Sequence, residues 1–271
     1  MLVTFVQECH QDTFGRNIGV LAVSGEEVDH LGMIHASLGL LKHYDHALIK
    51  YLIMGEPTEL KLVLKQKGMI KLKLKSHGKA AHSGYPQLGV DAIQPLIQFV
   101  NALYLIYPNN HSGDGVTMNV GVIRGGDAPN VVPNYAECVV MFRVIGSATE
   151  IVDHVCALAM KYNVKCEVIT VNEPYDYMEL SAAELNDVNV SVDPIVAYNT
   201  DTPYGHFFEN ALLFGAGSIL DAHTPHEMIK LHDLYQLPTH LHSIITTLSH
   251  NSRLSSITAP LLTTRGQHTE L

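Results

Sequence analysis

The sequence predicts an α/β fold with a mixed sheet, into which a smaller βαββαβ unit is inserted. Two observations predict the sheet: short, mostly apolar segments end at glycine, and stretches with helical periodicity separate them. A third observation predicts the insert, because strand and helix patterns in the middle of the chain follow the order of a ferredoxin-like unit. With 271 residues, 46% of them hydrophobic, the chain is long enough to bury a substantial core.

The first part of the chain predicts a strand, a helix and a second strand. Residues 18–24 are a mostly apolar and β-branched run that ends at Gly25, which is typical of a buried strand. Residues 31–44 place apolar side chains three or four positions apart, the stripe of an amphipathic helix. Those side chains are Leu31, Ile34, Leu38 and Leu41. Residues 47–54 predict another strand, and Pro57 prevents further pairing beyond it.

The middle of the chain predicts the inserted unit. Its strands are expected over 68–76, 116–124, 136–144 and 165–171, and its helices over 89–107 and 147–162. Pro95 lies inside the first of these helices and is expected to kink it or to end its first turn. A further strand is predicted over 211–214, before Gly215.

These patterns divide the chain into four expected segments. The first segment of the larger domain covers 1–67, the inserted domain 68–180, the second segment of the larger domain 181–250, and a tail 251–271. In parallel and mixed α/β sheets, ligands gather beyond the carboxyl ends of strands. A functional site is therefore expected where the strands of the larger domain end.

The composition excludes several classes of partner. Acidic residues outnumber Lys and Arg by 27 to 17, for a net charge of −10, so nucleic acid is not an expected partner. No apolar run reaches the ~18 residues of a membrane helix, and a membrane partner is not expected either. The four cysteines show no zinc-ribbon spacing and predict buried thiols. They are Cys9, Cys138, Cys156 and Cys166.

Carboxylates and one histidine follow the predicted strands at three separate places. Glu26 and Glu27 follow the run that ends at Gly25, Glu56 follows the next strand, and His223 comes shortly after the strand at 211–214. Two adjacent carboxylates at a strand end can divide the work of metal-assisted hydrolysis, one binding the metal and the other accepting a proton from water. Carboxylate and imidazole ligands together are typical of catalytic zinc.

Each of these signals also has an ordinary structural interpretation. An isolated pair of glutamates is more often a solvated pair at a helix start. Glu56 could be a turn residue, and His223 could precede a helix that Thr224 caps and Glu227 completes. The combination carries the functional interpretation.

A series of motifs in matching order resembles the di-zinc family of aminoacylases, acetylornithine and succinyl-diaminopimelate deacylases, and carboxypeptidases. The motifs are S-G-E-E-V-D-H-L-G-M (24–33), G-E-P-T-E-L-K-L-V (55–63), G-K-A-A-H-S-G-Y-P-Q-L-G (78–89), G-G-D-A-P-N-V-V-P (125–133), F-R-V (142–144), F-G-A-G-S (214–218) and A-H-T-P-H-E (222–227). The resemblance covers about residues 1–245, and H-S-G-Y-P-Q-L-G is most similar to the carboxypeptidase-type members.

The resemblance implies a zinc exopeptidase fold, two zinc ions per site and a role for each matching residue. Glu26 is implied as the general base, Glu27 and Glu56 as ligands of different zinc ions, and His223 as the late ligand. The insert over 68–180 is implied as a lid and dimerisation domain, which makes a homodimer the expected assembly. Three residues match residues of that domain: His82, Asn130 and Arg143. Read without the family, His82 could be structural and Arg143 could be a surface charge. His82 is implied to stabilise the oxyanion in the partner's site, and Asn130 and Arg143 to bind substrate.

The resemblance breaks before Glu26. The family takes its remaining ligands, a histidine in H-x-D and a bridging aspartate, from well upstream of the Glu-Glu pair, where this chain has 25 residues. His10 and Asp12 form H-x-D but lie too close to Glu26 for a bridging aspartate to intervene. The ligand set is therefore expected to be incomplete, as in a fragment lacking the N-terminal part of the catalytic domain or a degenerate homologue.

Two functions follow from the sequence. The first is zinc-dependent hydrolysis of peptide or N-acyl amino-acid amide bonds, of carboxypeptidase or deacylase type and impaired in this chain. The second is a catalytically inactive dimerising homologue with a regulatory or vestigial role. The sequence does not identify the substrate side chain or the compartment.

Overall fold

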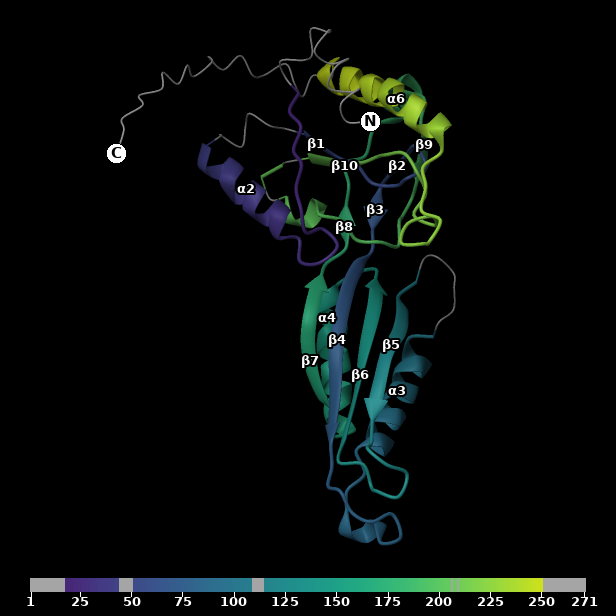
Figure 1. Cartoon of the computed structure of the whole chain (residues 1–271). Helices are drawn as coiled ribbons and strands as arrows, with labels where there is room; N and C mark the ends of the chain where they lie inside the picture. Colours follow the sequence, from purple (N-terminus) through teal and green to yellow (C-terminus); the bar gives the residue numbers. More distant parts are fainter. Residues whose placement is uncertain (1–17, 44–50, 109–114, 206, 209, 251–271) are drawn as a thin grey trace, which may run out of the picture.

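The protein is described here by a computed structural model that covers residues 18–43, 51–108, 115–205, 207–208 and 210–250 (Figure 1). The predicted tail over 251–271, the first residues of the strand predicted over 47–54, and Cys9, His10 and Asp12 lie outside these residues. The described chain forms a terminal region, built from residues 18–66 and 175–250, and a central region, built from residues 67–174. Figure 1 shows the central region extending away from the terminal region as one long sheet with helices on one face.

The central region is a four-stranded antiparallel sheet. Its strands are β4 (Gly68–His77), β5 (Thr117–Gly125), β6 (Tyr135–Val144) and β7 (Lys165–Asn172). They lie in the order β5-β6-β4-β7, and every neighbouring pair is antiparallel. The strands and helices predicted between residues 68 and 172 are all present in the βαββαβ order, which confirms the ferredoxin-like unit.

Two helices, α3 (Ile93–Ile106) and α4 (Ala148–Lys161), cover one face of this sheet (Figure 1). Side chains of β4 and β6 alternate between buried and partly exposed, as expected for a sheet covered on one face. The buried set includes Leu72, Val140 and Phe142, which are fully enclosed, and it packs with Phe99 of α3. The central region therefore has an apolar core of its own.

Pro95 lies in the first turn of the first helix of this region, and the helix continues past it to Ile106. The helix begins at Ile93, so Pro95 occupies its first turn. Backbone N–H groups of a first turn have no partner inside the helix, so the missing donor of proline costs no helical hydrogen bond there. The helix start predicted at residue 89 was too early. The residues before Ile93 form a short 3-10 turn, Pro86–Leu88, followed by a loop.

The cysteines only partly match the prediction of buried thiols. Cys138 is a buried free thiol, which is confirmed. Cys156 of α4 and Cys166 of β7 instead form a disulfide with 5.3 Å between their Cα atoms. The prediction was wrong for this pair because the packing of α4 on β7 brings the two residues together, and their spacing in the sequence does not indicate it.

The terminal region contains a mixed four-stranded sheet. Its strands are β1 (Tyr51–Met54), β2 (Lys61–Val63), β9 (Ser191–Asp193) and β10 (Asn210–Leu213). β10 pairs in parallel with β1 and antiparallel with β2, and β2 pairs in parallel with β9. The mixed α/β class is thereby confirmed.

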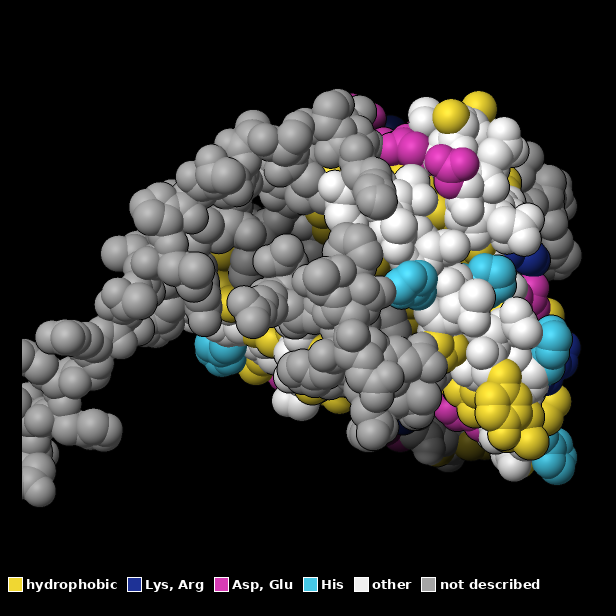
Figure 2. Space-filling model, turned by 90° about the horizontal axis from the view of Figure 1, so that it is seen from above, with side chains coloured by type: hydrophobic (Ala, Val, Ile, Leu, Met, Phe, Trp, Pro, Cys, Tyr) yellow, Lys and Arg dark blue, Asp and Glu magenta, His cyan; other side chains and the backbone are white. Residues whose placement is uncertain are grey.

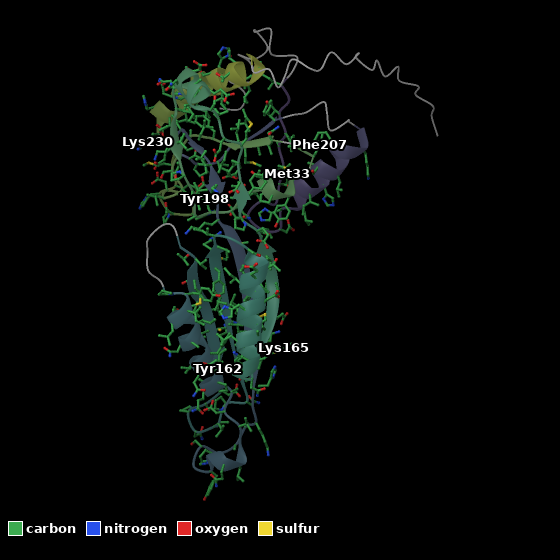
Figure 3. All side chains as sticks on the ribbon, turned by 180° about the vertical axis from the view of Figure 1, so that it is seen from behind. Met33, Tyr162, Lys165, Tyr198, Phe207 and Lys230 are labelled. Atoms are coloured by element: carbon green, nitrogen blue, oxygen red, sulfur yellow. A yellow bond between two sulfur atoms is a disulfide. The ribbon has the colours of Figure 1, made fainter. Side chains whose placement is uncertain are left out.

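Helices flank the mixed sheet. Helices α5 (Ala182–Val188) and α6 (Leu231–His250) pack on one face through a cluster that includes Leu212, Phe214 and Ile244. Helix α2 (Leu31–His43), predicted over 31–44, lies on the other side of Figure 1 from α6. Figure 3 places Met33 of α2 beside Phe207, and the backbone N–H of Phe207 donates to Ser37 Oγ at 3.0 Å. These contacts fasten α2 to the segment that leads into β10.

The strand predicted over residues 18–24 is not formed. These residues have no strand assignment, and the side chains of Val20 and Leu21 are 49% and 42% exposed. An apolar, β-branched run becomes a strand only if a neighbouring strand accepts its hydrogen bonds, and no described strand pairs with this one. The run is instead an extended lead into the turn at Gly25.

A short ladder joins the two regions. Strands β3 (Lys65–Gln66) and β8 (Tyr175–Asp176) pair antiparallel at the point where the chain enters and leaves the central region. Beside the ladder, the hydroxyl of Tyr177 donates to Gln66 Oε1 at 2.5 Å and Thr200 Oγ1 donates to the same oxygen at 2.7 Å. Because Gln66, Tyr177 and Thr200 are buried, these bonds replace water at the junction.

Candidate functional site

Glu26 and Glu27 lie on a compact turn between the extended residues 18–24 and α2. The backbone N–H groups of Val28, Asp29 and His30 all approach the carbonyl oxygen of Gly25, at 3.1, 3.0 and 2.9 Å. Gly25 has φ of +85°, a left-handed conformation that favours glycine. The turn therefore gives both glutamates a fixed backbone, although the predicted strand before them is absent.

Glu56 lies two residues after the end of β1, in the loop that leads from β1 to β2. Its backbone runs against Gly215, where a Cβ atom would stand 2.3 Å from the Glu56 carbonyl oxygen. Thr58 Oγ1 also accepts a hydrogen bond from the N–H of Gly215 at 3.0 Å. The glycine that ends the β10 segment thus allows the two loops to touch, which fixes Glu56 at the carboxyl end of the β1–β10 pair.

His223 reaches the site from the loop after β10. Its Nε2 lies 3.4 Å from Glu27 Oε1, with 69% of each side chain exposed. No helix begins at His223: Thr224 Oγ1 donates to the carbonyl of Asp221 and the N–H of His223 donates to Glu227 Oε2 in a turn. The helix-capping interpretation of this segment was therefore wrong, since α6 starts later, at Leu231.

The carboxylates of the site affect one another. Burial raises the pKa of Glu56 to about 8, with additional contributions from Glu26, Asp201 and Glu27. Burial likewise raises the pKa of Glu26, and Glu27 and Asp201 raise it further. The mutual effects require Glu26, Glu27 and Glu56 to lie near one another, as expected from their positions beyond the predicted strand ends. Such perturbed carboxylates are a feature of functional sites.

Two buried residues that the sequence did not indicate belong to this site. Asp201 is 2% exposed and His30 is 8% exposed, and His30 Nδ1 lies 2.9 Å from Asp201 Oδ1. Tyr198 precedes Asp201 by three residues. Its hydroxyl donates to the carbonyl of Pro57, and burial together with Glu56 raises its pKa (Figure 3). No sequence motif signals a pair 171 residues apart, so only the fold shows that Asp201 joins the glutamates.

The donor set suits a metal ion only in part. Carboxylate and imidazole are ordinary zinc ligands, and a buried carboxylate cluster with raised pKa values is an environment that a cation would stabilise. Within the described part of the chain, however, no group of three or more His, Cys, Asp or Glu side chains is arranged to hold a metal ion. The Glu27–His223 pair is thus a partial donor set, whereas a catalytic zinc site has three protein ligands.

His82 and Asn130 lie far from these carboxylates in the same chain. Both are exposed in loops at the end of the central sheet, where the N–H of Ser83 donates to the carbonyl of Asn130 at 2.9 Å. β4 separates them from the junction, and its ten residues span about 30 Å. Figure 1 shows this tip pointing away from the terminal region. The two residues are therefore close to each other and not to Glu26.

Arg143 occupies the opposite end of the central sheet. It stands next to the last residue of β6, across from Met69 of β4 and Thr117 of β5, on the face that α3 and α4 leave uncovered. Its Nη1 is buried and has no hydrogen-bond partner among the described residues, and burial lowers its pKa. A buried guanidinium nitrogen without a partner is costly unless a ligand satisfies it.

The upper face of the terminal region is mixed in character. Seen from above, its described part carries acidic and histidine side chains among hydrophobic ones, with few Lys or Arg side chains in view (Figure 2). This agrees with the net charge of −10. No described helix combines the length and the apolar character needed to cross a membrane.

Comparisons with known proteins cover most of the chain. Residues 64–161 match the model of a peptidase dimerisation domain. A peptidase M20 domain-containing protein of Schizosaccharomyces pombe is 33% identical over 222 residues, which are 81% of this chain and 52% of that protein. A probable carboxypeptidase of Paracoccidioides brasiliensis is 35% identical over 237 residues, 80% of this chain and 53% of that protein. The chain thus spans about half the length of these curated relatives.

Solved structures share the fold at lower identity. An aminopeptidase PepT of Bacillus cereus superposes with a TM-score of 0.63 at 16% identity, over 84% of this chain and 63% of that one. A tripeptidase of Staphylococcus aureus gives a TM-score of 0.64 at 18% identity, with the same coverage of 84% and 63%. At this level of identity, the superpositions show that the arrangement of the two regions is shared.

Proposed function

Because this chain belongs to the M20 peptidase family, we propose that it hydrolyses peptide or N-acyl amino-acid amide bonds, with impaired activity in the chain as given. The observation that carries the proposal is the convergence of Glu26, Glu27, Glu56 and His223 from three loops at one end of the mixed sheet. The family resemblance implied these four residues as the general base and the metal ligands; His82, the other implied catalytic residue, lies at the far end of the central region.

Glu26 is the proposed general base. Burial and the neighbouring carboxylates raise its pKa, and a more basic carboxylate accepts a proton from water more readily near neutral pH. The same group can then return the proton to the leaving amine, so one residue serves both halves of the hydrolysis. The turn closed on Gly25 holds it in place throughout.

Zinc is the proposed cofactor, with Glu27 and His223 holding one ion and Glu56 contributing to a second. When bound, zinc supplies Lewis acidity for the scissile carbonyl and for water. The described donors form only a pair at Glu27 and His223, so we expect weak, substoichiometric binding by this chain. This incomplete donor set is the reason for proposing impaired activity.

The central region is the proposed lid and dimerisation domain. Its limits were expected at residues 68 and 180; the β3–β8 ladder supports the first limit and suggests an earlier second one, close to residue 174. In a homodimer, the exposed tip could bring His82 into the partner's site, where it would stabilise an oxyanion. Arg143, with its unpartnered Nη1, is the proposed contact for a substrate carboxylate, and Asn130 contributes from the tip.

A second function remains in competition. The absence of a three-ligand metal group among the described residues, together with the high exposure of Glu27 and His223, favours a dimerising homologue without catalysis. In that case the central region still associates with a second copy. The two functions predict different responses to added zinc.

The deciding experiment measures zinc content, hydrolysis of N-acyl amino acids and dipeptides, and oligomeric state for the full chain and two variants. Glu26→Gln should abolish zinc-stimulated turnover while zinc binding is preserved. Glu179→Gln is the matched control, because Glu179 is exposed and distant in sequence from the site residues. Two tightly held zinc ions per chain with full turnover would contradict the proposed impairment. A dimer with no turnover at any zinc concentration would support the non-catalytic function.

A further inference from the structure

His30 closes the turn that carries Glu26 and Glu27, and it does so in an unusual conformation. Its φ is +58°, a left-handed value that residues other than glycine rarely adopt. The N–H of Gly32 donates to the carbonyl of Ser24 at 3.1 Å, which completes the turn and starts α2. A strained residue at this point persists only if its surroundings fix it.

Those surroundings come from the segment before β10. Asp201 binds the His30 ring at Nδ1, 2.9 Å away, and the Tyr204 ring stacks on the His30 ring with centroids 4.6 Å apart and planes 18° apart. The two contacts define both the position and the tilt of the imidazole. Since all of these side chains except that of Tyr204 are buried, the pair is shielded from water.

Tyr204 extends the same contacts to the central region. Its hydroxyl donates to Oδ1 of Asn172, the last residue of β7. Asn172 is 5% exposed and lies opposite Met69, the second residue of β4, at the end of the sheet nearest the junction. A continuous set of contacts therefore runs from the central sheet through Asn172, Tyr204 and His30 to the catalytic turn.

We propose that Asp201, His30 and Tyr204 form a positioning link that holds the turn bearing Glu26 and Glu27 in register with the end of the central sheet at Asn172. This inference rests on the proposed function, because positioning matters only if Glu26 performs chemistry. None of the three residues contacts substrate in the proposed reaction. Their role is to set where Glu26 points when the central region is in place.

The chemistry of the contacts fits positioning better than simple stability. A buried polar pair contributes little net stability, because the cost of removing both groups from water offsets much of the hydrogen bond between them. A hydrophobic pair would anchor the turn as strongly but would not define the ring orientation. Hydrogen bonds and ring stacking are directional, so they can fix Glu26 within the small tolerance that proton transfer requires.

The test removes the hydrogen bond between Tyr204 and Asn172, which joins the terminal region to the central region. Tyr204→Phe removes the hydroxyl but keeps the stack on His30, and Asn172→Ala removes the other end of the same hydrogen bond. Amide hydrogen exchange is followed at Val28, Asp29, His30 and Gly32, whose N–H groups close the turn. Each variant should speed exchange there by about fivefold, the equivalent of one lost hydrogen bond of ~1 kcal/mol.

Two controls separate the link from general destabilisation. Tyr162→Phe removes a tyrosine hydroxyl at the far end of α4, where no hydrogen bond of the hydroxyl crosses between the regions, and it should leave the turn unchanged (Figure 3). Exchange in the β4–β6 ladder should stay unchanged in all variants.

The double variant, Tyr204→Phe with Asn172→Ala, should exchange no faster in the turn than either single variant, because both substitutions remove the same contact. Unchanged exchange in the turn, or additive effects in the double variant, would overturn the link.

Turnover gives a second measurement. A residue that only stabilised the fold would not lower kcat selectively while KM stays the same. In Tyr204→Phe, zinc-stimulated kcat should fall by about fivefold with KM unchanged, since substrate contacts remain and only Glu26 is displaced. A rise in KM with kcat unchanged would contradict positioning. If the turn responds while Glu26→Gln keeps full activity, the proposed function fails and the physical link stands. If Glu26→Gln behaves as proposed and the turn does not respond, the link fails alone.

Discussion

The central and terminal regions fill their interiors differently. The core between the central sheet and its helices is almost entirely apolar, and the buried polar residues of that region are Lys67, Ser76 and Asn172. The terminal region buries a larger polar set: His30, Ser37, Thr58, Gln66, Thr200, Asp201 and Thr202. Apolar burial stabilises, whereas buried polar groups must be matched one by one. The apolar core therefore stabilises the central region as a support, whereas part of the polar interior of the terminal region, His30 and Asp201, belongs to the candidate site.

The largest expected effect breaks the central core. Phe142→Ala should reduce the free energy of unfolding by about 3–5 kcal/mol, because Phe142 is fully buried and its removal leaves a cavity. Urea unfolding with hydrogen exchange at β4 and β6 measures this loss. Tyr104→Ala on α3, where Tyr104 is 37% exposed, is the control and should cost far less. Equal losses in both variants would show that the core is not tightly packed.

The next effect is a pH dependence specific to the terminal region. Burial raises the pKa of Glu56 from 4.5 to about 8, so the folded chain binds a proton more tightly than the unfolded chain. The resulting stability is complete below pH 4.5 and is lost as pH rises through about 8, on the order of 5 kcal/mol in total. Thermal unfolding with a chelator present, from pH 5 to pH 9, measures it.

A matched variant isolates this dependence. Glu56→Gln should flatten the fall in stability between pH 5 and pH 9, because the amide does not titrate. Glu179→Gln should leave it unchanged, since Glu179 is exposed. A profile that keeps its slope in Glu56→Gln would show that another group is responsible.

Helix caps give a smaller effect that compares the regions directly. Ser147 accepts from the N–H of Glu150 at the start of α4, and Ser181 accepts from the N–H of Glu184 at the start of α5. Either serine replaced by alanine should cost about 1 kcal/mol. Hydrogen exchange should locate the first loss in the central region and the second in the terminal region. A loss that spreads to both regions in either variant would contradict independent cores.

The smallest effect concerns the junction. Lys65 Nζ lies 3.2 Å from Asp176 Oδ1 in the β3–β8 ladder, with side chains 53% and 74% exposed. Lys65→Met should change the free energy of unfolding by less than about 0.5 kcal/mol, because exposed ion pairs contribute little. Chemical denaturation at low and high salt checks this. A change above 1 kcal/mol would mean that the side chains, and not the backbone ladder, join the regions.

The sequence predicted the central region well because its signals are local. Strand β4 alternates apolar and polar residues over 70–75, β6 contains the continuous apolar run 138–142, and Ser147 marks the start of α4. Each of these patterns lies within one element, so no knowledge of the neighbouring strand is needed.

In the terminal region, prediction failed where structure depends on distant partners. The apolar run over 18–24 had the composition of a strand, but none of the described strands pairs with it, and β2 and β9 are too short to show a period. Helix α5 was missed although Ser181 and Glu184 form a capping box, a signal that the sequence does contain. Helix α6 was missed because Pro238 and several histidines interrupt its helical pattern.

The candidate site divides in the same way. Glu26, Glu27, Glu56 and His223 could be named because each follows a glycine or a strand in a recognisable motif. The contact between Asp201 and His30 could not be predicted, because it spans 171 residues; His30 stands inside the motif over residues 24–33, but nothing in that motif indicates Asp201. Residues that touch across such a separation are specified by the complete fold.

The pairing of Met69 with Asn172 places the entrance and the exit of the central region on adjacent strands. A segment whose two ends lie side by side can be removed, lengthened or exchanged without moving the rest of the chain, as in circular permutation and domain insertion. For protein engineering, the β3–β8 ladder is therefore a splice point: a cassette with equally close ends could be grafted there. In evolution, the same geometry allows the terminal region to acquire or replace an entire inserted domain in a single recombination event.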